Sequence, residues 1–149
     1  MRYFAYCTLL DRHEMARFCP NATPGDTGHI SGWRVEFAAY DTDRGGCHLV
    51  SDPGHDIHGI VYDLSDEEMM GLDTISGVPQ GFYRRIDVEV TTGDGRVIPA
   101  ITYVIPNPLG PFSPSEAYVR PILAGAHAIN LPAAYIAELE ATVAAALES

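Results

Sequence analysis

The densest group of side chains with ligand chemistry lies between residues 47 and 58. It consists of Cys47, His48, Asp52, His55, Asp56 and His58. Thiolates, imidazoles and carboxylates all bind zinc or copper, so a metal site is one hypothesis for this segment. Its spacing fits no common metal motif, however, and Pro53-Gly54 predicts a loop. We therefore favour solvated loop histidines, and we expect no metal and no cofactor.

Asp73 and Ser76 are a second candidate for chemistry. The segment Thr74-Ile75-Ser76-Gly77-Val78 lacks the first and last glycines of the G-x-S-x-G turn that exposes a serine nucleophile. Asp73, three residues earlier, could serve as a proton acceptor, but such an aspartate more commonly makes a hydrogen bond at a helix end or turn. Both roles of Asp73 stay open from the sequence.

The cysteines Cys7, Cys19 and Cys47 offer thiol chemistry. An odd count without a C-x-x-C pair predicts reduced thiols and argues against a structural zinc site. Cys7 precedes a predicted helix, and helix N-termini lower the pKa of a thiol, so Cys7 as nucleophile is one interpretation. The favoured alternative is a small buried residue.

The charge balance excludes several classes of partner. The chain has 149 residues, 20 acidic and 9 basic side chains, no lysine and a net charge of −11. Its length fits one domain spanning residues 1–149. With Arg84-Arg85 as its one adjacent basic pair, it should not bind nucleic acid, and Schiff-base chemistry is excluded. No apolar run approaches the roughly 20 residues of a membrane span, and the N-terminus lacks a signal-peptide pattern, so we expect a cytoplasmic protein.

The elements that position these side chains are mostly strands in the first two-thirds of the chain. Alternation and turn signals predict strands at residues 2–6, 29–40, 47–50, 57–64, 82–92 and 97–105. Gly93-Asp94-Gly95 joins the last two into a hairpin, and Asp52-Pro53-Gly54 separates the third from the fourth.

Capping residues predict short helices that start after Asp11, Ser65 and Ser115. Pro121 should limit the third of these or displace its start. Pro132 opens a last helix, on which Tyr135, Leu139, Val143 and Leu147 share one face. This order predicts an α+β fold: a small, curved or barrel-like mixed β-sheet with short helices.

Several segments resemble, in order, the γ-glutamylcyclotransferase-like (AIG2-like) family. Residues 3–10 read Y-F-A-Y-C-T-L-L against the family's Y-F-A-Y-G-S-N-L, and residues 72–78 read L-D-T-I-S-G-V against its L-D-x-x-E-G. Further matches lie at residues 32–37, 58–62, 81–83, 102–104, 115–118, 125–126 and 131–135. The resemblance spans nearly the whole chain and implies the fold predicted above.

The resemblance also implies a site. In the family, the loop after the first strand holds the carboxylate and amino end of a γ-glutamyl group through backbone N–H groups, as an anion site without lysine can. Here that loop consists of Tyr6, Cys7, Thr8, Leu9 and Leu10, while Tyr83 and Tyr118 match pocket positions. Leu9 replaces an asparagine, so the pocket chemistry should differ.

Ser76 stands where the family has its catalytic glutamate. That glutamate moves protons while the substrate amine attacks the γ-carbonyl, and a serine hydroxyl cannot accept a proton as a base. Ser76 could instead hydrogen-bond a substrate or a water, or be a turn residue before Gly77. We therefore expect a divergent enzyme that acts on a small γ-glutamyl-, amide- or carboxylate-bearing metabolite, with Ser76 and Asp73 as catalytic candidates. A non-catalytic binding protein, a lyase or decarboxylase of small carboxylates, a structural subunit and a homodimer stay open.

Overall fold

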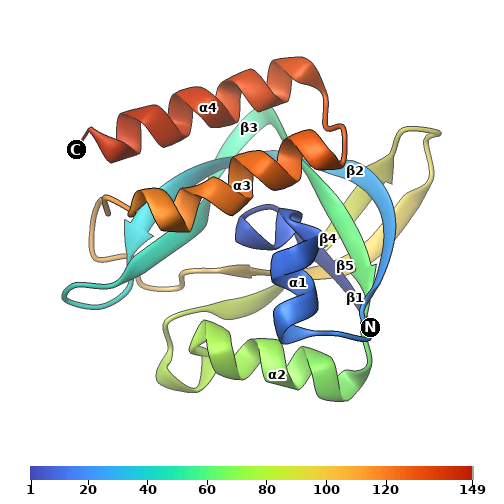
Figure 1. Ribbon diagram of the computed structural model, residues 1–149, viewed down its shortest axis with the longest axis horizontal. Coiled ribbons are helices and arrows are strands. Elements are labelled where there is room, and N and C mark those ends of the chain that lie inside the picture. The colour runs from blue at the N-terminus through green and yellow to red at the C-terminus, as the bar shows by residue number, and fades with distance from the viewer. Residues whose placement is uncertain (149) are drawn as a thin grey trace.

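The computed structural model describes residues 1–148 and contains a closed β-barrel with helices around it (Figure 1). The strands are β1 (Arg2–Ala5), β2 (Thr23–Ala39), β3 (Gly45–Asp63), β4 (Arg84–Thr92) and β5 (Val97–Val104). Their order around the barrel is β1-β3-β2-β4-β5, and β1 closes it by pairing in parallel with β5 while the other neighbours are antiparallel. The predicted α+β, barrel-like mixed sheet is confirmed.

Strands β2 and β3 form one long hairpin that dominates the barrel. The sequence predicts two strands at 47–50 and 57–64, but β3 runs unbroken through Asp52-Pro53-Gly54. That prediction is wrong because the turn residues are absorbed by an irregularity: Ser31 pairs with Asp56 and Trp33 with Ser51, so β3 carries extra residues opposite Gly32. Consequently residues 47–58 lie on a strand, and the expectation of loop histidines is also wrong.

The helices begin where their capping residues predict. They are α1 (Arg12–Phe18), α2 (Asp66–Ser76), α3 (Glu116–Ala128) and α4 (Ala133–Leu147), with short 3-10 helices η1 (Thr8–Leu10) and η2 (Val78–Gln80). Asp11 accepts hydrogen bonds from the first turn of α1, Ser65 and Glu68 form a capping box on α2, and Ser115 caps α3.

Two helix predictions need correction. Pro121 lies inside α3 and neither ends it nor displaces its start, since Ser115 fixes the N-terminus one and a half turns earlier. On α4, Tyr135, Leu139 and Val143 are buried as predicted, but Leu147 is 38% exposed at the helix end.

The helices bracket the barrel from two sides. Helices α3 and α4 lie together on one side, and α2 lies on the other beyond α1 (Figure 1). Gly125 on α3 allows close contact with η1, because a Cβ atom there would collide with the backbone of Leu10 and Asp11. Helix α3 therefore fixes the segment between β1 and α1. None of the described helices combines the length and apolarity needed to cross a bilayer.

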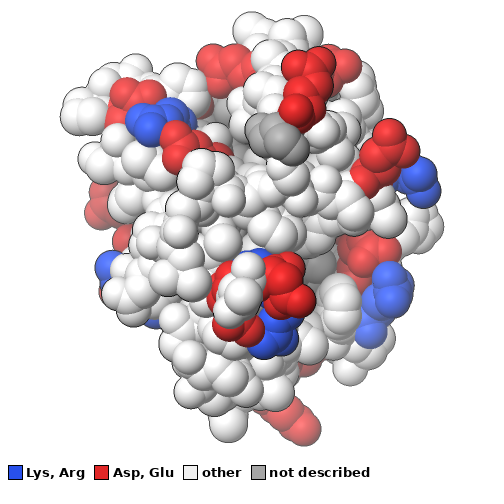
Figure 2. Space-filling view, turned by 90° about the vertical axis from the view of Figure 1, so that its left-hand side faces the viewer, with Lys and Arg blue, Asp and Glu red and all other residues white. Residues whose placement is uncertain are grey.

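Charged side chains are mixed on the surface. On the face in Figure 2, basic groups lie beside acidic ones in small clusters. Ion pairs involve the arginines at positions 2, 17, 34, 44, 85 and 96. Most basic side chains are thus already matched to neighbouring acids.

Candidate functional site

A cavity of about 270 Å³ opens between the β1–η1 segment and the C-terminal end of α2. It is lined by Tyr3, Tyr6, Cys7, Thr8, Leu9, Phe18, Tyr40, Gly45, Cys47, Leu72, Ile75, Ser76, Tyr83, Tyr103 and Tyr118. The structure therefore brings the predicted anion loop, Ser76 and both predicted pocket tyrosines around one hollow. It does not bring Leu10 there, because Leu10 is fully buried in the core.

The described lining contains no carboxylate, imidazole or guanidinium group, but it contains six tyrosines. Burial, reinforced by neighbouring phenols, raises the pKa of Tyr6 and of Tyr83 well above 10, and burial also raises the pKa of Tyr118. These phenols are neutral and protonated at physiological pH. The cavity wall thus offers hydroxyl donors and no strong proton acceptor.

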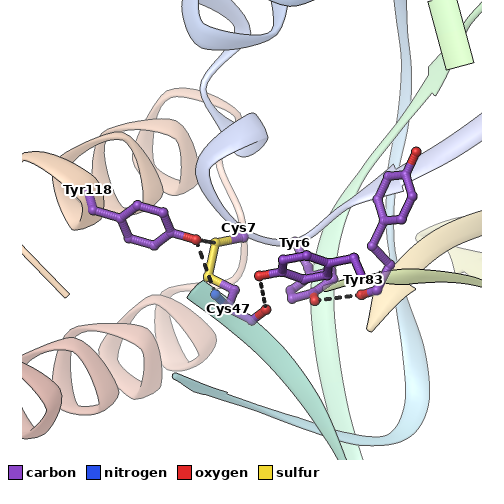
Figure 3. The surroundings of a disulfide bond; sticks show 6 residues. Tyr6, Cys7, Cys47, Tyr83 and Tyr118 are labelled. Atoms are coloured by element: carbon purple, nitrogen blue, oxygen red, sulfur yellow. Dashed lines mark hydrogen bonds between the residues drawn. A yellow bond between two sulfur atoms is a disulfide. The ribbon is translucent and has the colours of Figure 1, made fainter. Parts of the chain in front are cut away.

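Hydrogen bonds between tyrosines and backbone shape the wall (Figure 3). The hydroxyl of Tyr83 donates to the carbonyl oxygen of Cys47 at 2.7 Å, and the Cys47 N–H donates to the hydroxyl oxygen of Tyr118 at 3.1 Å. Tyr6 donates to the carbonyl of Tyr103 at 2.7 Å. Gly46 leaves room for this arrangement, since a Cβ atom there would lie 2.6 Å from both the Tyr83 and Tyr118 oxygens.

Cys7 and Cys47 are joined by a disulfide, with their Cα atoms 6.2 Å apart. The expectation of reduced thiols is wrong for this pair and stands only for Cys19, which is free and buried. The cysteines are 40 residues apart, and barrel closure brings them together, so the odd cysteine count could not reveal the pairing. The hydroxyl of Tyr118 lies 3.6 Å from Cys7 Sγ and is the donor there, because a disulfide sulfur carries no hydrogen.

Asp73 does not line the cavity but supports a residue that does. Arg85 donates to both carboxylate oxygens of Asp73, at 2.9 and 2.7 Å, and the hydroxyl of Tyr103 donates at 2.6 Å. Burial opposes ionisation of Asp73, but these hydrogen bonds outweigh it and lower the pKa of the carboxyl. Of the two roles left open by the sequence, the structure shows the hydrogen-bonding one.

Comparison with known proteins identifies the family. The AIG2-like family model matches residues 56–139, a stretch that includes Ser76, Tyr83 and Tyr118. The chain belongs to the AIG2-like family.

Relatives of this AIG2-like protein cover most of its length. Human gamma-glutamylcyclotransferase is 28% identical over 145 residues, which is 93% of this chain and 77% of the relative. The bovine gamma-glutamylcyclotransferase is 27% identical over 139 residues, covering 89% and 73%. A solved gamma-glutamyl cyclotransferase structure superimposes with a TM-score of 0.88 at 26% identity, covering 95% of this chain and 86% of that one. These similarities confirm the predicted γ-glutamylcyclotransferase-like family.

Sequence reasoning missed part of the lining of this AIG2-like cavity. Tyr3, Tyr40, Cys47 and Tyr103 come from four different segments: β1, the β2–β3 turn, β3 and β5. The one available signal was the number of tyrosines, eight in 149 residues, but composition does not say which of them converge.

The group of side chains between residues 47 and 58 is dispersed along β3. His48 Nδ1 accepts the N–H of Ile105 at 3.0 Å, and His55 Nδ1 lies 2.7 Å from the Trp33 carbonyl oxygen. Within the described residues, no three His, Cys, Asp or Glu side chains are grouped to hold a metal ion. These histidines are half-buried structural groups.

Proposed function

We propose that this AIG2-like protein is a divergent cyclotransferase-like enzyme that acts on a small metabolite bearing a γ-glutamyl, amide or carboxylate group. The similarity to gamma-glutamylcyclotransferases over 93% of the chain supports the substrate class. The position of the cavity supports it too, because the Tyr6–Leu9 segment and Ser76 lie on its walls.

The anionic end of the substrate binds at the β1–η1 segment. Thr8 and Leu9 open a 3-10 helix, so their N–H groups have no carbonyl partner within that helix. Tyr118 adds a hydroxyl that lies on the cavity wall 3.6 Å from Cys7 Sγ, a weak acceptor, so a substrate oxygen can compete for its proton. Leu9, Leu72 and Ile75 supply an apolar wall for the rest of the molecule.

The reaction of this protein differs from a cyclisation in which a carboxylate acts as the base. An α-ammonium group must lose a proton before it attacks a carbonyl, and the described wall offers no group to accept that proton. This observation carries the proposal of altered chemistry. Hydroxyl donors can stabilise negative charge that develops on a substrate oxygen during a reaction step. Such a step would use a nucleophile or a leaving group that is already neutral, so that no base is needed.

The same lack of a base favours one alternative, a binding protein without turnover. In that case the cavity holds the same carboxylate-bearing ligand and releases it unchanged. The two candidates differ in whether any product appears.

The test uses γ-glutamyl-L-alanine as probe, with calorimetry for binding and mass spectrometry for products. We expect the wild type to bind it and to form no 5-oxoproline above a heat-denatured control. Ser76→Glu should form 5-oxoproline, and the matched Ser76→Gln, which lacks the base, should not. A wild type that cyclises as fast as Ser76→Glu would contradict the altered chemistry.

The remaining outcomes separate enzyme from binder. A product other than 5-oxoproline supports the enzyme, and binding with no change in probe mass supports the binding protein. Tyr118→Phe should bind at least several-fold more weakly, whereas Tyr135→Phe, whose buried hydroxyl has no hydrogen-bond partner among the described residues, should bind like the wild type. Absence of binding by the wild type would overturn both candidates.

A further inference from the structure

The Cys7–Cys47 disulfide joins two walls of the cavity that no strand pairing joins. Cys7 follows β1, and β1 pairs with the far end of β3, at residues 60–63. Cys47 lies near the start of β3, where it pairs with Phe37 of β2. The sulfur bridge is therefore a direct covalent tie between the anion-loop side of the cavity and the hairpin side (Figure 3).

The fold has ample support without this bond. The core includes fully buried residues on β1, β3, α2 and α3, such as Phe4, Ile57, Met69 and Ile122. A chain of this length buries enough apolar surface to fold without a covalent crosslink, unlike small disulfide-dependent domains. A disulfide at a cavity wall in such a fold has no evident structural necessity.

Both cysteines are also held by hydrogen bonds that do not involve sulfur. The Cys47 backbone is bound on both sides, through its N–H to Tyr118 and through its carbonyl to Tyr83. The Cys7 carbonyl accepts the N–H of Leu10 at 3.1 Å. Two thiols would thus stay close together after the bond opens, which makes re-formation of the disulfide easy.

The two cysteines differ in exposure. Both line the cavity, but Cys7 is partly exposed whereas Cys47 is 2% exposed. An incoming thiolate can therefore reach Cys7 Sγ through the cavity, with Cys47 as the leaving group.

We propose that Cys7–Cys47 is a reversible redox-modification site, at which a small dithiol opens the cavity wall and an oxidant of the disulfide class closes it. One thiolate of the dithiol forms a bond to Cys7 Sγ, the Sγ–Sγ bond breaks, and Cys47 leaves and takes up a proton. The second thiolate attacks the reductant sulfur of the mixed disulfide and releases Cys7, which is protonated in turn. The protein gains two electrons and two protons, and the dithiol becomes a cyclic disulfide. This proposal does not depend on the identity of the ligand.

Opening the bond frees the β1–η1 segment from the hairpin. The contact between the Tyr118 hydroxyl and Cys7 Sγ is then to a thiol that is no longer bonded to Cys47 and fluctuates more, while the backbone hydrogen bonds of both cysteines keep the two thiols near each other. We expect the amides of residues 7–10 and of residues 45–48 at the start of β3 to exchange hydrogen several-fold faster in the reduced protein, while the rest of β3 and the other barrel strands keep their protection.

The experiment treats the folded protein with dithiothreitol, then with iodoacetamide, and reads labelling by peptide mass and amide exchange by mass spectrometry. Without reductant, Cys7 should not be labelled. With reductant and no denaturant, Cys7 should be labelled first and Cys47 slowly, and the circular dichroism spectrum should stay folded. In a parallel reduced sample, exchange of the reductant for oxidised dithiothreitol before iodoacetamide is added should make both cysteines unreactive again.

Two variants control the result. Cys19→Ser, which removes the free buried thiol, should behave like the wild type. Cys47→Ser should show fast exchange at residues 7–10 with and without reductant. Labelling of Cys7 in untreated protein, labelling that requires denaturant, unfolding on reduction, or equal amide exchange in both states would each overturn the proposal.

Discussion

Asp73 and Ser76 are three residues apart on α2, but their surroundings give them different chemistry. Asp73 is bound by Arg85 and Tyr103 and so holds Tyr103 against the cavity. Ser76 lies on the cavity wall itself. At the scale of single residues, the aspartate positions Tyr103, whereas the serine lines the cavity.

Replacement of Asp73 by asparagine should remove an acid-sensitive part of the stability. The folded-state pKa of Asp73 is lowered, so its contribution is fully present above the unfolded pKa of about 3.9 and is lost as the pH falls through the folded value. We expect Asp73→Asn to unfold about 1–3 kcal/mol more easily than the wild type at pH 7, with the difference shrinking toward pH 3. Urea unfolding at both pH values measures it, and a difference independent of pH would contradict this role.

Helix α2 carries these two residues, and Gly77 caps the helix directly after Ser76. Gly77 has a φ of +79°, and a Cβ atom there would lie 2.5 Å from the Phe82 ring. Ser76 is the last residue of α2 and immediately precedes this left-handed residue, so Gly77 determines how the chain turns away from the helix beside the serine.

Two alanine substitutions in and beside α2 should therefore have opposite effects. Gly77→Ala should destabilise by at least about 1–2 kcal/mol, through the positive φ and the clash with Phe82. Gly71→Ala, in the exposed middle of the same helix with no atom within 4 Å of the added Cβ, should stabilise by about 0.5–1 kcal/mol. Thermal unfolding of the two variants tests this, and similar effects would mean that the glycine at 77 is not conformationally required.

Helix caps and a tight turn, which act within a few residues, correctly predicted the helices and the hairpin that depend on them. Ser65 and Glu68, Asp11, and the Gly93-Asp94-Gly95 turn each act within a few residues, and each element they predict is present. The turn at Asp52-Pro53-Gly54 failed as a strand boundary because pairing with β2 on both sides of it, up to Ser51 and again from Asp56, keeps the strand continuous through an irregularity.

At the scale of the whole molecule, barrel closure determines which distant residues lie side by side, and local sequence patterns do not predict this. It brings Cys7 to Cys47 and gathers tyrosines from β1 and the loop after it, from β5, from α3 and from two further loops. The resemblance of residues 3–10 and 72–78 to one family predicted that the loop after β1 and Ser76 belong to one site. A family resemblance includes information on tertiary structure, which residue spacing alone does not contain. Neither the residue patterns nor the family resemblance predicted the disulfide.

A long-range contact also ties the last helix to the barrel. His55 on β3 lies with Nδ1 2.7 Å from the Trp33 carbonyl oxygen and Nε2 2.9 Å from Glu138 Oε2 on α4. Both partners can only accept, so this geometry suits the ring with both nitrogens protonated, and the bond to Trp33, then Glu138, raises the pKa of His55 despite partial burial.

The contact should stabilise the protein in mild acid and not in base. For a group whose pKa is raised by folding, the contribution is fully present below the unfolded pKa of about 6.5 and is lost as the pH rises through the folded value. Glu138→Gln should therefore destabilise by less than about 1 kcal/mol at pH 6 and by almost nothing at pH 8.5, where the amide can donate to the neutral ring. Comparing both proteins by chemical unfolding at the two pH values cancels the titration of every other group. A larger loss at pH 8.5 would show that Glu138 holds α4 through some contact other than charged His55.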